Sequence, residues 1–468
     1  MVKQPFLAIG VLGCAGAVAG MLTVAGRPAT AHENEFDLLA FENTSGQART
    51  VNINGALDLE NPFFQDLGAN GRRCVTCHQP ETAWTITPAN VRARFSASRG
   101  TDPIFRNNDG SNCEGATPRS RAEQREAYSL VLNRGLIRVG LDVPQGAEFA
   151  IDSVDDPNDC GPASNEVSVY RRPLPTANLR FLSGVMWDGR ESSPTTSIFQ
   201  DLLHQANSAT RGHAQAAQDI TGEQAQQMVQ FELGLFTAQA RDNRAGSLRA
   251  DGATGGPRAL SRQPFFIGIN DPIGLNPTGA AFDPRAFTPF DAWIGLAGSR
   301  DDPVVAARRA IARGQELFNT KSFTISGVSG LNGQTFPNGV TVAASITGTC
   351  TICHDTPNAG DHSVKAPLNI GLTDPAVAPY LPVYTLRNLS TQDTVRTTDP
   401  GRAMITGKWQ DVGRLKGPIL RALAARAPYF HNGSAETLEE AIEFYDTRFN
   451  IGLTARERAD LAAFLRAL

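Results

Sequence analysis

Apolar side chains recur at helical spacing in the last third of the chain. Residues 303–318 place Val304, Ala307, Ile311, Leu317 and Phe318 on one helix face. Two Thr-x-x-Glu sequences, 437–440 and 454–457, have the capping pattern that begins a helix. The apolar positions that follow are Leu438, Ile442 and Tyr445 in the first helix, and Leu461, Phe464, Leu465 and Leu468 in the second. The pattern therefore predicts three helices here.

The rest of the chain is less regular. Residues 120–134 and 196–243 favour helix, whereas 100–175 and 245–300 are rich in Gly, Pro, Asp and Asn and predict irregular structure. We find no stretch whose pattern is typical of several strands. The sequence therefore predicts a mostly α fold with long irregular loop insertions.

The first 31 residues differ from all others. A long apolar run is followed by Ala29-Thr30-Ala31, which is typical of a signal-peptide cleavage site. We expect a signal peptide over 1–31, export to the periplasm, and no stable membrane insertion after cleavage. An uncleaved anchor is the alternative, because the run is almost long enough to span a bilayer.

Composition narrows the class of protein. A chain of 468 residues with 41% apolar and 19% charged residues suits a globular protein of two or three domains. The formal net charge of −4 gives no reason to expect nucleic acid binding.

Cysteine usage follows from the expected export. Of seven cysteines, Cys14 lies in the signal peptide and four lie in two Cys-x-x-Cys-His motifs. The remaining pair, Cys113 and Cys160, is expected to form a disulfide in an oxidising compartment, which would pin the loop insertion at about 100–165. Two free buried thiols are the alternative.

The two motifs are Cys74-x-x-Cys77-His78 and Cys350-x-x-Cys353-His354. A zinc site would need its two cysteine pairs much closer in sequence, and a redox-active pair would not need a histidine beside it. Covalent haem attachment needs all three residues, since two thiols bond the vinyl groups and the histidine ligates iron. The motifs therefore predict two covalently bound haem c groups.

At this point the chain resembles a known family. Residues 420–446, 185–191 (VMWDGRE) and 314–318 (GQELF) are similar to bacterial di-haem cytochrome c peroxidases and the MauG group, most of all to its longer, MbnH-like members. The resemblance implies two cytochrome c-type haem domains. We place the first at 32–300, with a Gly/Pro-rich connection at about 245–300, and the second at 301–468.

The resemblance also implies roles for Tyr445 and Trp187. Tyr445 stands where MauG-like proteins have a tyrosine ligand to the second haem and ordinary peroxidases have methionine. The helix pattern alone favours a core tyrosine, and Met404 is the runner-up ligand. Trp187 matches the tryptophan that relays electrons between the haems, with a buried aromatic as the plain alternative.

The family's peroxide-activating residues are only partly matched. The segment after Trp187 places Gln205 at the family's Gln position, but Gln215 stands where the family has Glu. His213, two residues away, is the expected substitute acid–base because its pKa range suits neutral pH. An exposed histidine at a helix end is the alternative, and His204 is a weaker candidate.

A calcium ion between the domains is a further implication of the resemblance. Its carbonyl donors map onto Arg426 and Pro428, and its side-chain donor onto Asn178, at a shifted position. Arg171 and Arg172 are candidates to pair with haem propionates or to be a solvated basic pair.

Together these expectations describe a periplasmic di-haem peroxidase-type oxidoreductase of the MauG kind. It would reduce hydrogen peroxide at haem one and oxidise a partner protein by long-range electron transfer, with Tyr445 on haem two. The alternatives are a cytochrome c peroxidase that detoxifies peroxide with a small donor cytochrome, and a di-haem electron carrier without enzymatic activity.

Overall fold

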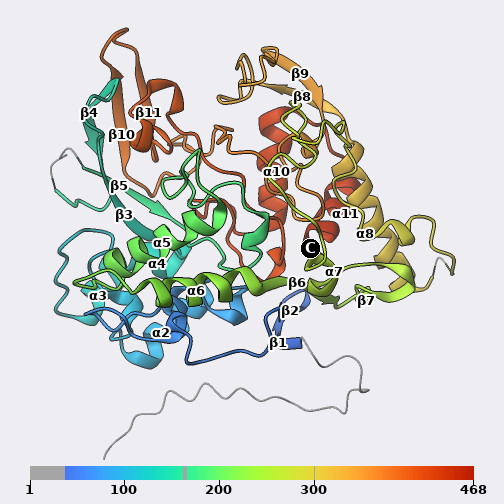
Figure 1. Ribbon diagram of the computed structural model, residues 1–468, viewed down its shortest axis with the longest axis horizontal. Helices are drawn as coiled ribbons and strands as arrows, with labels where there is room; N and C mark the ends of the chain where they lie inside the picture. Colours follow the sequence, from blue (N-terminus) through green and yellow to red (C-terminus); the bar gives the residue numbers. More distant parts are fainter. Residues whose placement is uncertain (1–36, 162–165, 300) are drawn as a thin grey trace, which may run out of the picture. The chain divides into compact units, whose positions relative to one another are not determined.

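Helices and strands are mixed throughout the part of the chain that the computed structural model describes, residues 37–161, 166–299 and 301–468 (Figure 1). Helix accounts for 31% of the structure and strand for 17%, divided among several sheets. The expected mostly α fold is therefore wrong. The predicted signal peptide lies outside the described residues.

The largest sheet has the strand order β1-β2-β6-β7. Its members are β1 (Asp37–Asn43), β2 (Gly46–Asn52), β6 (Leu235–Asp242) and β7 (Gly246–Ser247). β6 occupies the end of 196–243, where we expected helix. Its antiparallel partner is β2, and the hydroxyls of Thr50 and Thr237 lie 2.7 Å apart across the pair although they are 187 residues apart in sequence. Pairing with this distant strand stabilises β6 as a strand, although the local sequence pattern does not predict one.

A second sheet joins strands from the two halves that we expected to be separate domains. Its order is β11-β10-β4, from β4 (Phe149–Asp155), β10 (Val383–Asn388) and β11 (Thr394–Thr397). Two antiparallel pairs are β3 (Ile137–Asp142) with β5 (Glu166–Arg171), and β8 (Phe323–Ser326) with β9 (Ser345–Gly348). Residues 36–468 form one compact unit, and the proposed domain boundary near residue 300 stays a prediction.

The longer helices include those that the apolar pattern predicts. They are α2 (Pro88–Ser98), α5 (Ile198–Gly212), α6 (Gly222–Gly234), α8 (Pro303–Thr320), α10 (Leu438–Phe449) and α11 (Ala455–Arg466). The region 120–134 is divided into α3 (Arg121–Ala127) and α4 (Ser129–Arg134). Short helices are α1 (Cys74–Cys77), α7 (Pro257–Leu260) and α9 (Ala403–Thr406).

The three predicted C-terminal helices are confirmed, with small differences in detail. Thr454 and Glu457 form a full capping box at α11, whereas at α10 only Thr437 caps, because Glu440 accepts from the backbone N–H of Glu436. Val304 is exposed rather than part of the apolar face of α8, since it lies in the first turn.

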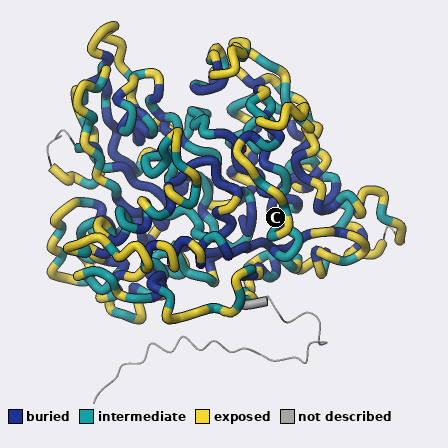
Figure 2. The backbone as a smooth tube through the Cα atoms, viewed as in Figure 1, coloured by how far each residue is buried: buried dark blue, intermediate teal, exposed yellow. Residues whose placement is uncertain are grey.

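Helices α8 and α11 pack closely because α8 carries Gly314. A Cβ at this position would lie 2.0 Å from the backbone oxygen of Asp460 on α11. Around this contact lies a core of aromatic side chains: Phe287, Phe290, Trp293, Phe318 and Phe464. Figure 2 shows the buried backbone concentrated along the inner strands and helices. Among the described residues, no helix has the length and apolar character needed to cross a membrane.

Candidate functional site

Two internal cavities each contain one of the Cys-x-x-Cys-His motifs. Cavity one, of about 200 Å³, is lined by Cys74, Cys77 and His78. Cavity two, of about 220 Å³, is lined by Cys350, Cys353 and His354. Both cysteines of the first motif lie on α1, whereas in the second motif Cys350 begins the 3₁₀ turn Cys350–Ile352 and Cys353 caps its end. Because the two cysteine pairs belong to different cavities, they do not form one four-cysteine zinc site.

The two histidines are held in the same way. The Nδ1 of His78 lies 3.1 Å from the carbonyl oxygen of Trp84, and the Nδ1 of His354 lies 2.6 Å from that of Gly360. A carbonyl only accepts, so each Nδ1 carries the proton and each Nε2 keeps its lone pair. Burial lowers the pKa of His78 to about 4 and also lowers that of His354, although these hydrogen bonds oppose it. Both rings are therefore neutral and ready to ligate a metal through Nε2.

The cavities share a wall of seven residues: Arg172, Pro173, Leu174, Pro175, Trp187, Lys416 and Arg426. Three of the seven are basic, and burial lowers the pKa of Lys416 to about 8 and that of Arg172 to about 9. Within the described part of the chain, the guanidinium of Arg172 donates only to backbone carbonyls, those of Arg134, Ile86 and Arg426. A buried cation without a carboxylate partner is costly, so this wall suits an anionic group.

Unpaired donors test whether haem fits these cavities. The Nε atoms of Arg421 and Arg426, which line cavity one, have no hydrogen-bond partner among the described residues, nor has the Nε2 of His362 in cavity two. Haem carries two carboxylates beside its iron and vinyl groups. The thiols, the neutral histidines and the unpaired cationic donors together match those three features.

Arg171, the neighbour of Arg172, is not one of these unpaired cationic donors. Its buried guanidinium is bidentate to Asp399, at 2.7 and 2.9 Å, and also pairs with Asp188. These two carboxylates neutralise Arg171 and brace the turn that follows Trp187. The indole Nε1 of Trp187 donates to the Arg172 carbonyl at 2.8 Å, which fixes the ring between the cavities.

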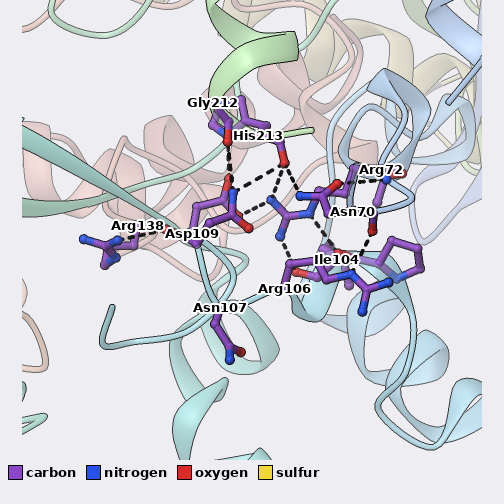
Figure 3. Close-up of polar contacts among 12 residues, drawn as sticks. Asn70, Arg72, Ile104, Arg106, Asn107, Asp109, Arg138, Gly212 and His213 are labelled. Atoms are coloured by element: carbon purple, nitrogen blue, oxygen red, sulfur yellow. Dashed lines mark hydrogen bonds and ion pairs between the residues drawn. The ribbon is translucent and has the colours of Figure 1, made fainter. Parts of the chain in front are cut away.

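Cavity one carries an acid–base arrangement that the sequence only half revealed. His213, just after α5, lines the cavity, and its Nδ1 lies 2.5 Å from Asp109 Oδ2 (Figure 3). The other oxygen of Asp109 accepts from Arg72, whose Nη2 also donates to the Ile104 carbonyl at 2.9 Å. Burial opposes ionisation of Asp109, but His213 and Arg72 lower the pKa of its carboxyl below the usual value. The charged Asp109 therefore orients the imidazole, so that the Nε2 of His213 is its free nitrogen.

Of the other predicted residues in this segment, one lines cavity one and two are exposed. Gln205 lines cavity one from α5. His204 faces outward, with 72% of its side chain exposed, and pairs with Glu191. Gln215, at the family's Glu position, is exposed and has a positive φ of 57°.

Glu232 on α6 is a buried carboxyl in cavity one that the sequence did not reveal. Burial raises its pKa to about 8, and its carboxyl has no hydrogen-bond partner among the described residues. It is therefore a neutral acid near pH 7.

Cavity two is walled by aromatic and aliphatic side chains. Tyr445 on α10 lines it together with Phe430 and Phe449, and its ring centroid lies 6.4 Å from that of His354. Burial raises the pKa of Tyr445, and its hydroxyl has no hydrogen-bond partner in the described part of the chain. Met404, the runner-up ligand, is buried in a separate core cluster with Phe149 and is not part of the cavity wall.

The candidate calcium donors lie close to the cavities. Asn178 lines cavity one, Pro428 lines cavity two, and Arg426 lines both. The amide of Asn178 is paired both ways with the backbone of Thr237, and the Arg426 carbonyl accepts from Arg172. The calcium ion stays a prediction. Cys113 and Cys160 are joined in a disulfide, 47 residues apart.

Comparisons with known proteins bear on part of the chain. No protein-family model matches it. The cytochrome-c peroxidases IdrP1 and IdrP2 of Denitromonas iodatirespirans are 32% and 33% identical over 139 and 135 residues, which is 25% and 26% of this chain. The chain spans only 36% of the length of each relative. The cytochrome c peroxidase Ccp of Escherichia coli (strain K12) is 37% identical over 76 residues, 16% of each chain.

The solved structures similar to this chain include one described as a MauG-like protein associated with microbial copper homeostasis, with 17% identity and a TM-score of 0.37 over 87% of this chain and 86% of that one. About a quarter of the present chain is thus similar in sequence to cytochrome-c peroxidases.

Proposed function

We propose that this protein is an exported, periplasmic di-haem peroxidase that reduces hydrogen peroxide and withdraws the electrons from a partner protein. The observation that carries the proposal is the pair of cavities, each with a Cys-x-x-Cys-His motif and a neutral histidine, that share Trp187 in one wall. The partial similarity to cytochrome-c peroxidases supports the same class of reaction.

In this proposal Cys74, Cys77 and His78 hold haem one, and Cys350, Cys353 and His354 hold haem two. Each bound haem supplies an iron that changes oxidation state and so makes electron transfer available. The carboxylates of both haems are met by the buried cations of the shared wall and by Arg421.

Cavity one is the place for hydrogen peroxide. The Nε2 of His213 takes a proton from one peroxide oxygen and returns it to the other, so that the O–O bond breaks and the second oxygen leaves as water. The first oxygen also becomes water once two protons and the two electrons withdrawn from the partner protein are supplied. Asp109 accepts from the Nδ1 of His213 and keeps the imidazole in the tautomer that this needs. Gln205 offers an amide that can hydrogen-bond to the bound peroxide.

Haem two, bound in cavity two, would supply a place to store an oxidising equivalent. Tyr445 together with His354 would hold its iron, and a phenolate ligand would favour the higher oxidation states of iron. Trp187 carries electrons between the cavities, so the partner protein is oxidised at a distance. No substrate side chain then has to reach either cavity.

A second candidate is a cytochrome c peroxidase that receives electrons from a small donor cytochrome. The specific observation in its favour is that the sequence relatives bear this name. In that case a reduced small cytochrome c is consumed with peroxide at two equivalents per turnover. In the leading proposal such a donor is a poor substrate.

The test starts from the exported, fully oxidised protein. Haem content is measured by the pyridine haemochrome method, and one equivalent of hydrogen peroxide is then added without an electron donor while absorption is followed. We expect two haems per chain and a spectral change that involves both. The double variant Cys350→Ser/Cys353→Ser is expected to keep one haem. A chain without covalent haem, or one that does not respond to peroxide, contradicts the proposal.

A further inference from the structure

His431 is a buried histidine whose two ring nitrogens have no hydrogen-bond partner among the described residues. It is 1% exposed and lines cavity two, and neither its Nδ1 nor its Nε2 makes a hydrogen bond to a described residue. A buried imidazole has one donor and one acceptor to satisfy, and leaving both unpaired destabilises the folded protein. The ring therefore indicates a group that it meets in cavity two.

The charged neighbours of His431 do not fill this role. The nearest is Asp399, with Oδ2 3.8 Å from Nε2, which is too long for a hydrogen bond. Asp399 is already bonded to Arg171 and to the backbone N–H of Gly401. Burial lowers the pKa of His431 to about 4, although Asp399 opposes this, so the ring is neutral and offers one N–H.

His431 is also tied to Trp187 in two ways. The two rings meet edge to face, with centroids 6.1 Å apart at 63°. In addition, the N–H of Arg172 donates to the carbonyl of His431 at 2.7 Å, while the carbonyl of Arg172 accepts from the Trp187 indole at 2.8 Å. A short bonded path therefore links the relay tryptophan to the wall of cavity two.

We propose that His431 donates its ring N–H to an acidic substituent of the cofactor in cavity two and couples that cofactor to Trp187. This rests on the proposed function, in which the cofactor is haem and the acidic group is a propionate. Lys416, Arg426 and Arg172 line the same wall, which favours an anionic group at this place. His431 transfers no proton in this proposal. It holds the cofactor in position and provides a contact along which electrons can pass.

The experiment measures electron transfer between the haems. A photoreductant delivers one electron to the fully oxidised protein, and equilibration between the haems is followed by absorption. His431→Leu is expected to slow equilibration by about tenfold or more and to shift the midpoint potential of haem two. His431→Gln, which keeps an N–H donor, is expected to recover most of both. The matched control is Met404→Leu, which changes a buried side chain of a separate core cluster that lines neither cavity.

The outcomes separate the inference from the proposed function. If His431→Leu has the wild-type rate and potential while Trp187→Phe is slow, the His431 inference alone is wrong. If neither variant is slow, the relay through Trp187 fails with it, and a protein without two haems overturns both proposals. Should His431→Leu not fold, His431→Phe removes the donor at similar size, and an unchanged rate in that variant contradicts the inference.

Discussion

The two cavities carry the same Cys-x-x-Cys-His sequence, yet their walls differ in chemistry. Both histidines donate Nδ1 to a carbonyl six residues further on, so the ligand itself is prepared identically. Cavity one adds His213, charged Asp109 and the neutral acid Glu232. Cavity two adds Tyr445 among phenyl rings.

In the proposed function, the shared motif would bind the same cofactor in both cavities, and the different walls would set what each cofactor does. Acid–base groups are useful where bonds to oxygen break, and cavity one pairs a histidine with a charged carboxylate for this. Cavity two is lined mainly by aromatic and aliphatic side chains, with the phenols of Tyr429 and Tyr445 among them. In the proposed function that wall would suit storage of an oxidising equivalent. Four predictions test whether the cavities divide the work in this way.

The largest expected effect is on the acid–base residue of cavity one. His213→Ala should slow the reaction of the oxidised protein with peroxide by about 10²–10⁴-fold, because general acid–base catalysis contributes that much. Stopped-flow absorption gives the rate. His204→Ala, at an exposed position of α5, which ends just before His213, is the matched control and should react normally. Equal rates in both variants would remove cavity one as the proton-transfer site.

The next effect concerns the residue that orients His213. Asp109→Asn should slow the peroxide reaction by about 10–100-fold, which is the usual cost of losing a partner that orients a functional group. The readout that separates orientation from folding is the pH profile of the rate, which should change shape in Asp109→Asn. Haem content should stay at two per chain. An unchanged profile would mean that Asp109 only holds Arg72.

A smaller effect on peroxide itself is expected from cavity two. Tyr445→Phe should leave the first reaction with peroxide within about threefold of the wild type, a change of less than 1 kcal/mol in the barrier. It should, however, abolish the spectral response of haem two. Met404→Leu is the control, since that residue is buried away from the cavity. If Met404→Leu alters haem two and Tyr445→Phe does not, the donor-cytochrome alternative is favoured.

The smallest effect concerns the brace behind the shared wall. Burial opposes ionisation of Asp188, but Arg171 and Arg190 lower its pKa to about 2 from 3.8. An acid whose folded pKa is depressed stabilises the fold above its unfolded pKa, and this is lost as pH falls from about 4 to about 2. The shift corresponds to about 2 kcal/mol. Urea unfolding between pH 2 and 6 should show this loss of unfolding free energy. If the free energy of unfolding of Asp188→Asn depends on pH as strongly as that of the wild type, the prediction is wrong.

The sequence reveals features that depend on local spacing. The chain alone predicts both motifs and the helices at 303–318, 437–446 and 454–468. Its resemblance to a family singles out Gln205 and His213, which line cavity one. These features depend on residues that are near neighbours in sequence. The strands could not be predicted, since β6 and β4 are fixed by partners in distant segments.

Two residues of cavity one were missed for the same reason. Asp109 is one of many acidic residues in a loop-rich stretch, and only the fold selects it by bringing it to His213. Glu232 reads as an ordinary acidic residue near the end of a helix until its burial is known. A chemical role that is created by burial or by long-range contact leaves little mark on the local pattern.

The pairing of β4 with β10 has a consequence for biosynthesis. Arg387 on β10 and Asp152 on β4 are joined by a hydrogen bond of 3.0 Å across 235 residues of sequence. Loop closure over this distance is slow, and β4 remains an unpaired edge until the ribosome has supplied β10. An emerging chain therefore displays the first Cys-x-x-Cys-His motif long before this sheet can assemble. The machinery that attaches a cofactor there would meet an open, unfinished first half.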